Sequence, residues 1–91
     1  MIENPFIKKK RVMKINIKYF AALREQANKS EEIIDTTYST PGDIYTELKS
    51  KYNFSLNVDE LKVAVNDCYE DFDYELKEMD TIVFIPPVAG G

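Results

Sequence analysis

The sequence closes on the stretch Val83-Phe84-Ile85-Pro86-Pro87-Val88-Ala89-Gly90-Gly91, which decides how the rest is interpreted. Its apolar beginning predicts a strand, and Pro86 and Pro87 stop strand pairing because they fix φ and remove two backbone donors. We therefore expect an extended tail to project from the fold. Gly90 and Gly91 lack a Cβ, so a terminal carboxylate can pass along a narrow channel into a partner's active site. The alternative is a frayed end without function.

Length and charge limit the possible functions. A chain of 91 residues predicts one small domain with little room for a deep catalytic pocket. The net charge is −4, and residues 1–12 carry +3, which leaves −7 for residues 13–91. This acidic body argues against nucleic-acid binding. It fits a partner with a basic docking face.

The chain has no histidine, and Cys68 is its single cysteine. This composition excludes an intramolecular disulfide, Ser-His and Cys-His nucleophile pairs, and zinc sites built from cysteine and histidine clusters. No apolar run approaches the length of a membrane span, and the N-terminus lacks the apolar core of a signal peptide. We expect a cytoplasmic protein without a bound metal or cofactor, and no membrane or nucleic-acid partner.

Periodicity predicts the elements in order. Residues 1–12 are expected to form a flexible basic leader, and Met13 opens the first regular element. Residues 14–20 predict a strand with Ile15, Ile17 and Tyr19 on one face, whereas Phe20 breaks the alternation and lies on the outer face. Further on, we expect a short helix or turn at 21–27, a strand at 31–37, a helix from 41 to 52, a strand at 61–66, a mostly exposed segment at 69–74 and a strand at 81–85 buried on both sides.

The helix prediction is the clearest, because Thr40 is a good N-cap, Pro41 suits the first helical position and Asn53 can end the helix. The order of elements in residues 13–91 predicts an α+β domain with a mixed sheet and one main helix across one face. The first and last strands lie at its centre and run parallel. This is the β-grasp, or ubiquitin-like, fold, which leaves the C-terminal Gly-Gly tail protruding.

Three motifs carry a family resemblance. The segment Tyr19-Phe20-Ala21-Ala22-Leu23-Arg24-Glu25 resembles the "F-A-x-x-R-E" segment of the small subunit of molybdopterin synthase, a MoaD-like sulfur carrier of the MoaD/ThiS family. Lys62-Val63-Ala64-Val65-Asn66 is similar to that family's "x-x-A-V-N" strand. Residues 80–91 resemble its "D-x-V-x-F-x-P-P-V-x-G-G" ending, which is the most specific of the three.

The resemblance implies a chain without catalytic side chains of its own. The Gly91 carboxylate would be adenylated by a ubiquitin-activating-like (MoeB-like) enzyme that uses ATP and Mg, and then converted to a thiocarboxylate. The large (MoaE-like) subunit, in a heterotetramer with this one, would accept the tail, for which Gly90 leaves room. Sulfur would then pass to cyclic pyranopterin monophosphate during molybdenum cofactor biosynthesis.

The resemblance also implies a docking surface beside the tail. Phe20, Tyr69 and Ile85 match apolar interface positions of the family, and Pro86, Pro87 and Val88 lead into the tail. Arg24 is expected to orient the tail or the partner. The alternative is that Phe20 and Ile85 are core residues and that Arg24 is a solvated surface charge.

Three other functions remain open. A sulfur carrier for thiamine or another thio-cofactor shares the Gly-Gly end, but fits the Pro-Pro-Val and Phe-Ala-x-x-Arg-Glu segments less well. A ubiquitin-like modifier would join Gly91 to a target lysine. A plain interaction module would not depend on Gly91.

Overall fold

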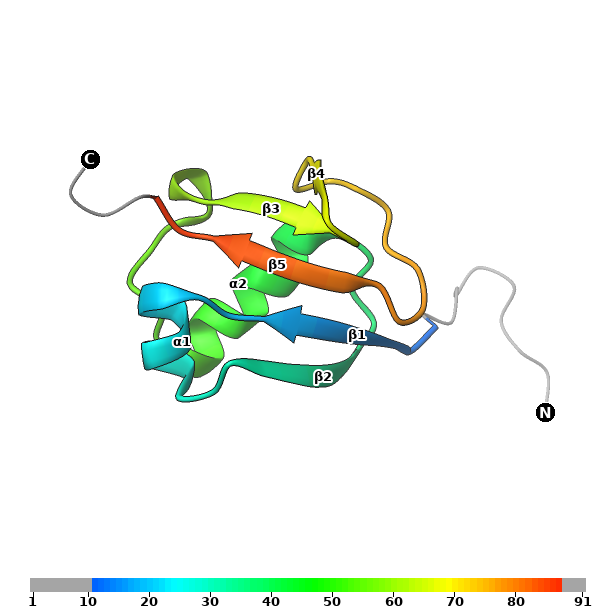
Figure 1. Cartoon of the computed structure of the whole chain (residues 1–91). Coiled ribbons are helices and arrows are strands. Elements are labelled where there is room, and N and C mark those ends of the chain that lie inside the picture. Colours follow the sequence, from blue (N-terminus) through cyan, green and yellow to red (C-terminus); the bar gives the residue numbers. More distant parts are fainter. Residues whose placement is uncertain (1–10, 88–91) are drawn as a thin grey trace, which may run out of the picture.

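The computed structural model describes residues 11–87, whose strands form one sheet in the order β2-β1-β5-β3-β4 (Figure 1). The elements are β1 Met13–Lys18, α1 Ala21–Ala27, β2 Glu31–Thr36, α2 Pro41–Tyr52, the 3-10 turn η1 Val58–Glu60, β3 Lys62–Val65, β4 Cys68–Glu70 and β5 Thr81–Ile85. β1 and β5 pair in parallel at the centre, and the other neighbours are antiparallel. The predicted β-grasp arrangement is confirmed, whereas residues 1–10 of the predicted leader lie outside the described residues.

One face of the sheet is packed against α2 and forms the core (Figure 1). The alternation predicted for β1 is confirmed, because Ile15, Ile17 and Tyr19 are buried. The same face is completed by Val63, Val65, Ile82 and Phe84 from β3 and β5, and by Ile44, Tyr45 and Leu48 from α2. The side of the sheet away from α2 is called the outer face below.

The ends of α2 are capped as the sequence predicts. The Thr40 Oγ1 accepts a hydrogen bond from the Asp43 N–H at 3.3 Å, and Asn53 ends the helix in the left-handed conformation, with φ 58°. The Gly42 N–H donates to the Phe72 carbonyl at 2.9 Å. A Cβ on Gly42 would lie 3.2 Å from that oxygen, so glycine permits this close approach between α2 and the loop before β5.

One prediction about burial is wrong, and a second holds only in part. β5 is not buried on both sides: Ile82 and Phe84 are fully buried, but Thr81, Val83 and Ile85 are only half-buried on the outer face, which α2 does not cover. The segment at 69–74 was predicted to be mostly exposed, which holds for Tyr69, Asp71 and Asp73 but not for its other aromatic residues. Its Phe72 and Tyr74 are half-buried against the core, and Phe72 stacks on Phe84 with ring centroids 6.5 Å apart.

A tight turn at Asn66 and Asp67 connects β3 to β4 and also ties β3 to the start of β5. Both residues have positive φ, 51° and 71°, as a two-residue hairpin turn requires. The Asn66 Oδ1 accepts from the Thr81 N–H at 3.0 Å, and its Nδ2 donates to the Asp80 Oδ1 at 2.9 Å. The other Asp80 oxygen accepts from the Lys77 N–H at 2.7 Å. Asn66 therefore helps to set the register of the last strand.

Replacing Asn66 by alanine should lower the free energy of unfolding by about 2–3 kcal/mol, because two hydrogen bonds are lost and a Cβ-bearing residue without a local polar group must keep a positive φ. Urea denaturation measures the difference. Asp67→Gly, in the same turn, is the control and should cost less than about 0.5 kcal/mol because glycine accepts positive φ. An Asn66→Ala chain as stable as the wild type would contradict this role.

A carboxylate on β2 joins three elements of the core. The Glu32 Oε2 accepts 2.6 Å hydrogen bonds from the hydroxyls of Tyr19 and Tyr52, and Lys29 lies 3.4 Å from Oε1. Burial opposes the charge on Glu32, but the hydrogen bonds from the two tyrosines and the Lys29 ammonium together hold its pKa below the usual value of 4.5. Burial and the bond to Glu32 raise the pKa of Tyr19 far above 10.

Because the folded-state pKa of Glu32 is depressed, its stabilisation is present above pH 4.5 and should be lost as the pH falls through the folded value. Glu32→Ala should cost about 1–3 kcal/mol at pH 7, since two tyrosine hydroxyls lose their acceptor. Urea denaturation at pH 7 and at pH 3 checks both statements. Glu31→Ala, at the exposed neighbouring position, should have little effect. Equal losses for the two variants would contradict the role of Glu32.

Candidate functional site

The C-terminal end of β5 is the candidate site. Because β5 is parallel to β1 and lies between β1 and β3, it is paired on both sides, and its last residue, Ile85, pairs with Lys62. Pro86 follows half-buried and Pro87 is exposed, so the ladder stops as predicted. Val88, Gly90 and Gly91 lie outside the described residues, and their predicted roles remain predictions.

Apolar side chains gather on the outer face beside this end of β5. One row of the sheet brings Val83 of β5 next to Ala64 of β3, which in turn pairs with Tyr69 of β4. Ile85 lies on the same face, two residues beyond Val83. Tyr69 is 74% exposed, and together with its apolar neighbours it forms a contiguous apolar area of the kind that marks interaction sites. We call Phe20, Ala64, Tyr69, Val83 and Ile85 the outer patch.

Phe20 joins the patch from the end of β1. Lys18 is the register partner of Val83 in the parallel pair. Phe20 lies two residues after Lys18, and Ile85 lies two residues after Val83, so Phe20 and Ile85 lie at matching positions. Tyr19 is buried and Phe20 is 49% exposed, so Phe20 lies on the outer side, and the alternative that it is a core residue is wrong. The core alternative for Ile85 is also wrong, because Ile85 is half-exposed on the uncovered face.

A groove lies where the tail leaves the sheet. Its volume is ≈ 310 Å³, and it is lined by Glu60, Lys62, Tyr69, Ile85, Pro86 and Pro87. Four of the predicted site residues, Tyr69, Ile85, Pro86 and Pro87, thus meet in one place. Arg24 does not line this groove; it is exposed on α1, and its guanidinium makes no ion pair within residues 11–87. The structure gives the tail a shaped, largely apolar base from which to extend.

Sequence reasoning missed four residues of this region: Lys62, Glu60, Val83 and Ala64. Lys62 was counted only as part of a strand, and Val83 was taken as core because it stands in an apolar run. The signal was the alternation itself, since Ile82 and Phe84 already fill the covered face and leave Val83 and Ile85 to the other. Which face stayed uncovered depended on the side of the sheet on which α2 packs.

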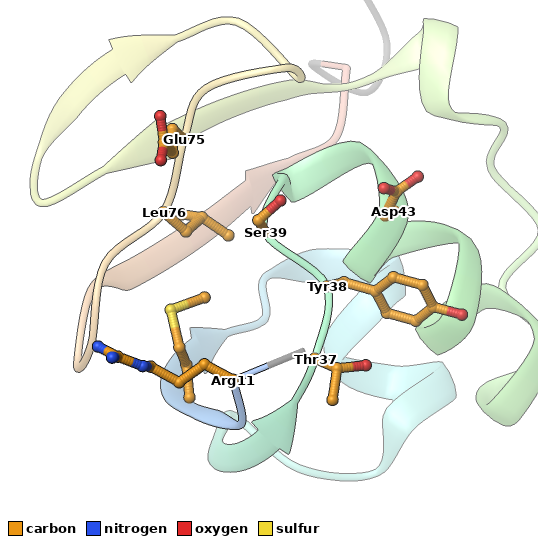
Figure 2. Close-up of a pocket in the computed structure, with 8 residues that line it drawn as sticks. Arg11, Thr37, Tyr38, Ser39, Asp43, Glu75 and Leu76 are labelled. Atoms are coloured by element: carbon orange, nitrogen blue, oxygen red, sulfur yellow. The ribbon is translucent and has the colours of Figure 1, made fainter. Parts of the chain in front are cut away.

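A second pocket, of ≈ 330 Å³, lies at the opposite end of the sheet (Figure 2). It is lined by Arg11, Met13, Thr37, Tyr38, Ser39, Asp43, Glu75 and Leu76. These residues come from the start of β1, the segment after β2, the start of α2 and the loop before β5 (Figure 2). The pocket is therefore separated by the length of the strands from the end where the tail leaves.

Within residues 11–87, no group of three or more aspartate, glutamate, cysteine or histidine side chains is placed to hold a metal ion. Neither described helix combines the length and the hydropathy that a membrane span needs.

Comparison with known proteins gives a consistent result. The model of the ThiS family matches residues 17–91. A molybdopterin synthase sulfur carrier subunit of Drosophila yakuba is 34% identical over 84 residues, which cover 88% of this chain and 93% of the relative. The subunit of the same name from Mycobacterium tuberculosis is 30% identical over 83 residues, and the match covers 88% of this chain and 100% of the relative.

Solved structures share the fold. A Pyrococcus furiosus protein assigned as subunit 1 of molybdopterin converting factor is 31% identical, with a TM-score of 0.71 and coverage of 84% of this chain and 99% of that one. Small archaeal modifier protein 1 of Methanosarcina acetivorans is 24% identical, with a TM-score of 0.70, over 89% of this chain and 99% of the other. Subunits 1 and 2 of molybdopterin-converting factor from Helicobacter pylori were solved as a complex, in which the matching chain is 21% identical, with a TM-score of 0.62, over 87% of this chain and 100% of that one.

Proposed function

Because the chain belongs to the ThiS family, we propose that it is a sulfur carrier and the MoaD-like small subunit of molybdopterin synthase. Two observations support this assignment: the sequence identity of 30–34% with sulfur carrier subunits, and the motifs at residues 19–25 and 80–91. The single observation that carries it is the position of β5, a central strand that is followed by Pro86 and Pro87 and ends beside the outer patch.

The proposed chemistry takes place on the main chain. A carboxylate is a poor electrophile, so the Gly91 carboxylate would attack the α-phosphate of ATP and form an acyl-adenylate, with release of pyrophosphate. A MoeB-like enzyme would bind the ATP and Mg for this step. A sulfur donor would then attack the acyl carbon, and AMP would leave with the bonding electrons. The product is a C-terminal thiocarboxylate, whose sulfur is a better nucleophile than oxygen.

The proposed partner is a MoaE-like large subunit. The relatives include a subunit 1 solved in complex with a subunit 2, and the outer patch gives this chain a surface of the kind such a complex uses. The large subunit would supply the catalytic side chains and bind cyclic pyranopterin monophosphate. The present chain would supply the sulfur on Gly91, and the groove lined by Ile85, Pro86 and Pro87 would help to direct the tail.

The experiment that tests the class is intact-mass analysis. The chain is incubated with MgATP, a MoeB-like enzyme and a sulfide source, and we expect a mass increase equal to the exchange of one oxygen for one sulfur. The increase should be absent when ATP is omitted and absent from a chain that lacks Gly91. A chain that is adenylated but never gains sulfur would contradict the sulfur-carrier assignment.

Replacement of Gly90 by valine should reduce sulfur transfer by about 100-fold, because a branched side chain would displace the reacting atom in a narrow channel. The measurement is single-turnover formation of molybdopterin from thiocarboxylated carrier, large subunit and cyclic pyranopterin monophosphate. Thr46→Val, on the exposed side of α2, is the matched control and should transfer sulfur at the wild-type rate. Full transfer by the Gly90→Val chain would rule out the threading role.

Alanine at Phe20 or Tyr69 should weaken binding of the large subunit by about 30-fold each, as expected for aromatic residues at the centre of an interface. Isothermal titration calorimetry with the carboxylate form of the chain measures this without any chemistry. Met79→Ala removes a comparably exposed apolar side chain, 50% exposed, from the loop before β5, and should leave affinity unchanged. If all three variants bound alike, the outer patch would not be the docking surface.

A ubiquitin-like modifier is the second candidate function. One specific observation favours it, the similarity to small archaeal modifier protein 1, although that likeness concerns the fold alone. A modifier would form thiol-resistant conjugates of higher mass through Gly91, and a sulfur carrier would not. A carrier for thiamine or another thio-cofactor would gain sulfur in the mass experiment but would not bind a MoaE-like subunit.

A further inference from the structure

Two lysines stand on either side of the strand that leads to the tail. Lys18 of β1 is the register partner of Val83, and Lys62 of β3 is the register partner of Ile85. Both follow the outer-face alternation of their strands, and both are exposed. The end of β5 therefore has a cation on each flank, with apolar residues of the outer patch between them.

Neither lysine has a partner within residues 11–87. Other lysines of the chain do: Lys14 pairs with Asp35 at 2.9 Å, Lys29 pairs with Glu32, and the Lys49 Nζ donates to the Phe54 carbonyl at 3.1 Å. No ion pair or side-chain hydrogen bond of the described part of the chain involves Lys18 or Lys62. Lys77 and Arg24 also lack a side-chain partner in the described part of the chain, so what distinguishes Lys18 and Lys62 is their position beside the outer patch.

The acidic residues closest in the sheet do not neutralise them. Glu31 is opposite Lys18 on the edge strand β2, and Glu60 lines the same groove as Lys62, but neither carboxylate forms an ion pair with its neighbour. Lys62 also lines a different pocket, of ≈ 300 Å³, together with Tyr69, Glu70 and Asp71. Both ammonium groups thus remain available to an incoming carboxylate.

We propose that the outer patch docks a partner surface that carries carboxylates opposite Lys18 and Lys62 and places an apolar side chain in the groove at Tyr69 and Ile85. The proposal rests on the proposed function and deepens it, because the partner is the large subunit of that function. The chain is acidic and carboxylates also lie near both lysines, so the proposal concerns two points of contact and not a basic surface. Charge complementarity at these two points would fix the orientation in which the tail approaches the partner's channel.

The energetic argument follows from solvent exposure. An ion pair between exposed side chains contributes about 0–1 kcal/mol, so these lysines add little to the stability of the free chain. At an interface, complementary charges accelerate association and exclude wrong partners, and their effect falls as salt screens them. The lysines should therefore act mainly on the association rate and on its dependence on ionic strength.

The test compares Lys62→Glu and Lys18→Glu with Lys77→Glu, which makes the same charge change in the loop before β5, at the opposite end of the sheet. The probe is the MoaE-like large subunit from the same organism, immobilised for surface plasmon resonance. At low salt we expect each of the first two variants to associate about tenfold more slowly than the wild type, and Lys77→Glu to stay within about twofold. The difference should shrink at high salt.

Lys18→Glu places a second carboxylate beside Glu31 and can disturb the sheet, so melting temperatures are measured for every variant. Lys18→Gln and Lys62→Gln avoid this problem and should still slow association by about threefold. Wild-type rates for all four variants, while Phe20→Ala still weakens binding, would overturn the charge proposal and leave the proposed function standing. A large subunit that fails to bind the wild-type chain at any salt concentration would overturn both.

Discussion

The parallel pairing of β1 with β5 is the constraint on which the rest of the structure depends. Three register pairs, from Asn16 with Thr81 to Lys18 with Val83, join the two ends of the described chain at the centre of one sheet. Parallel strands cannot be joined by a tight turn, so the helices and strands between β1 and β5 in the sequence form a long connection between these two strands. Because the two strands point the same way, β5 ends, and Pro86 and Pro87 follow it, at the end of the sheet where β1 gives way to α1 (Figure 1).

The second consequence is a sheet with one covered face. A helix of 12 residues is about 18 Å long, which is enough to cover one side of a small sheet but not two. On the outer face, β1 carries the polar residues Lys14, Asn16 and Lys18. On the same face, β5 carries Val83 and Ile85, and β3 carries Ala64. The outer face is therefore polar over β1 and apolar over β5, next to the tail. The packing of α2 on one face of the sheet thus forms the core and leaves the outer patch uncovered.

Much of this fold could be predicted from local signals. The alternation of Ile15, Ile17 and Tyr19 and the caps at Thr40 and Asn53 are properties of neighbouring residues, and each was confirmed. The burial of β5 and of Phe72 was predicted wrongly, because it depends on which face α2 covers and on where the loop before β5 folds back. These are long-range facts that hydrophobicity within a short window does not contain.

The candidate site divides in the same way. Tyr69, Ile85, Pro86 and Pro87 were predicted from motifs, and the structure places them around one groove. Lys18 and Lys62 carry no local signal, since a lysine on a strand is usually a solvated residue. What sets them apart is the strand register. Lys18 lies on β1 and Lys62 on β3, and only the pairing of both strands with β5 places the two lysines on either side of its end.

The central claim is that the outer face, at the end of β5, is where this chain meets its partner. The most direct measurement is amide NMR of the isotope-labelled chain during titration with an unlabelled MoaE-like large subunit. The account predicts that shifts and line broadening concentrate at Phe20, Ala64, Tyr69, Val83 and Ile85, while the exposed side of α2 stays unperturbed. Perturbations centred on α2, with the end of β5 unchanged, would contradict it.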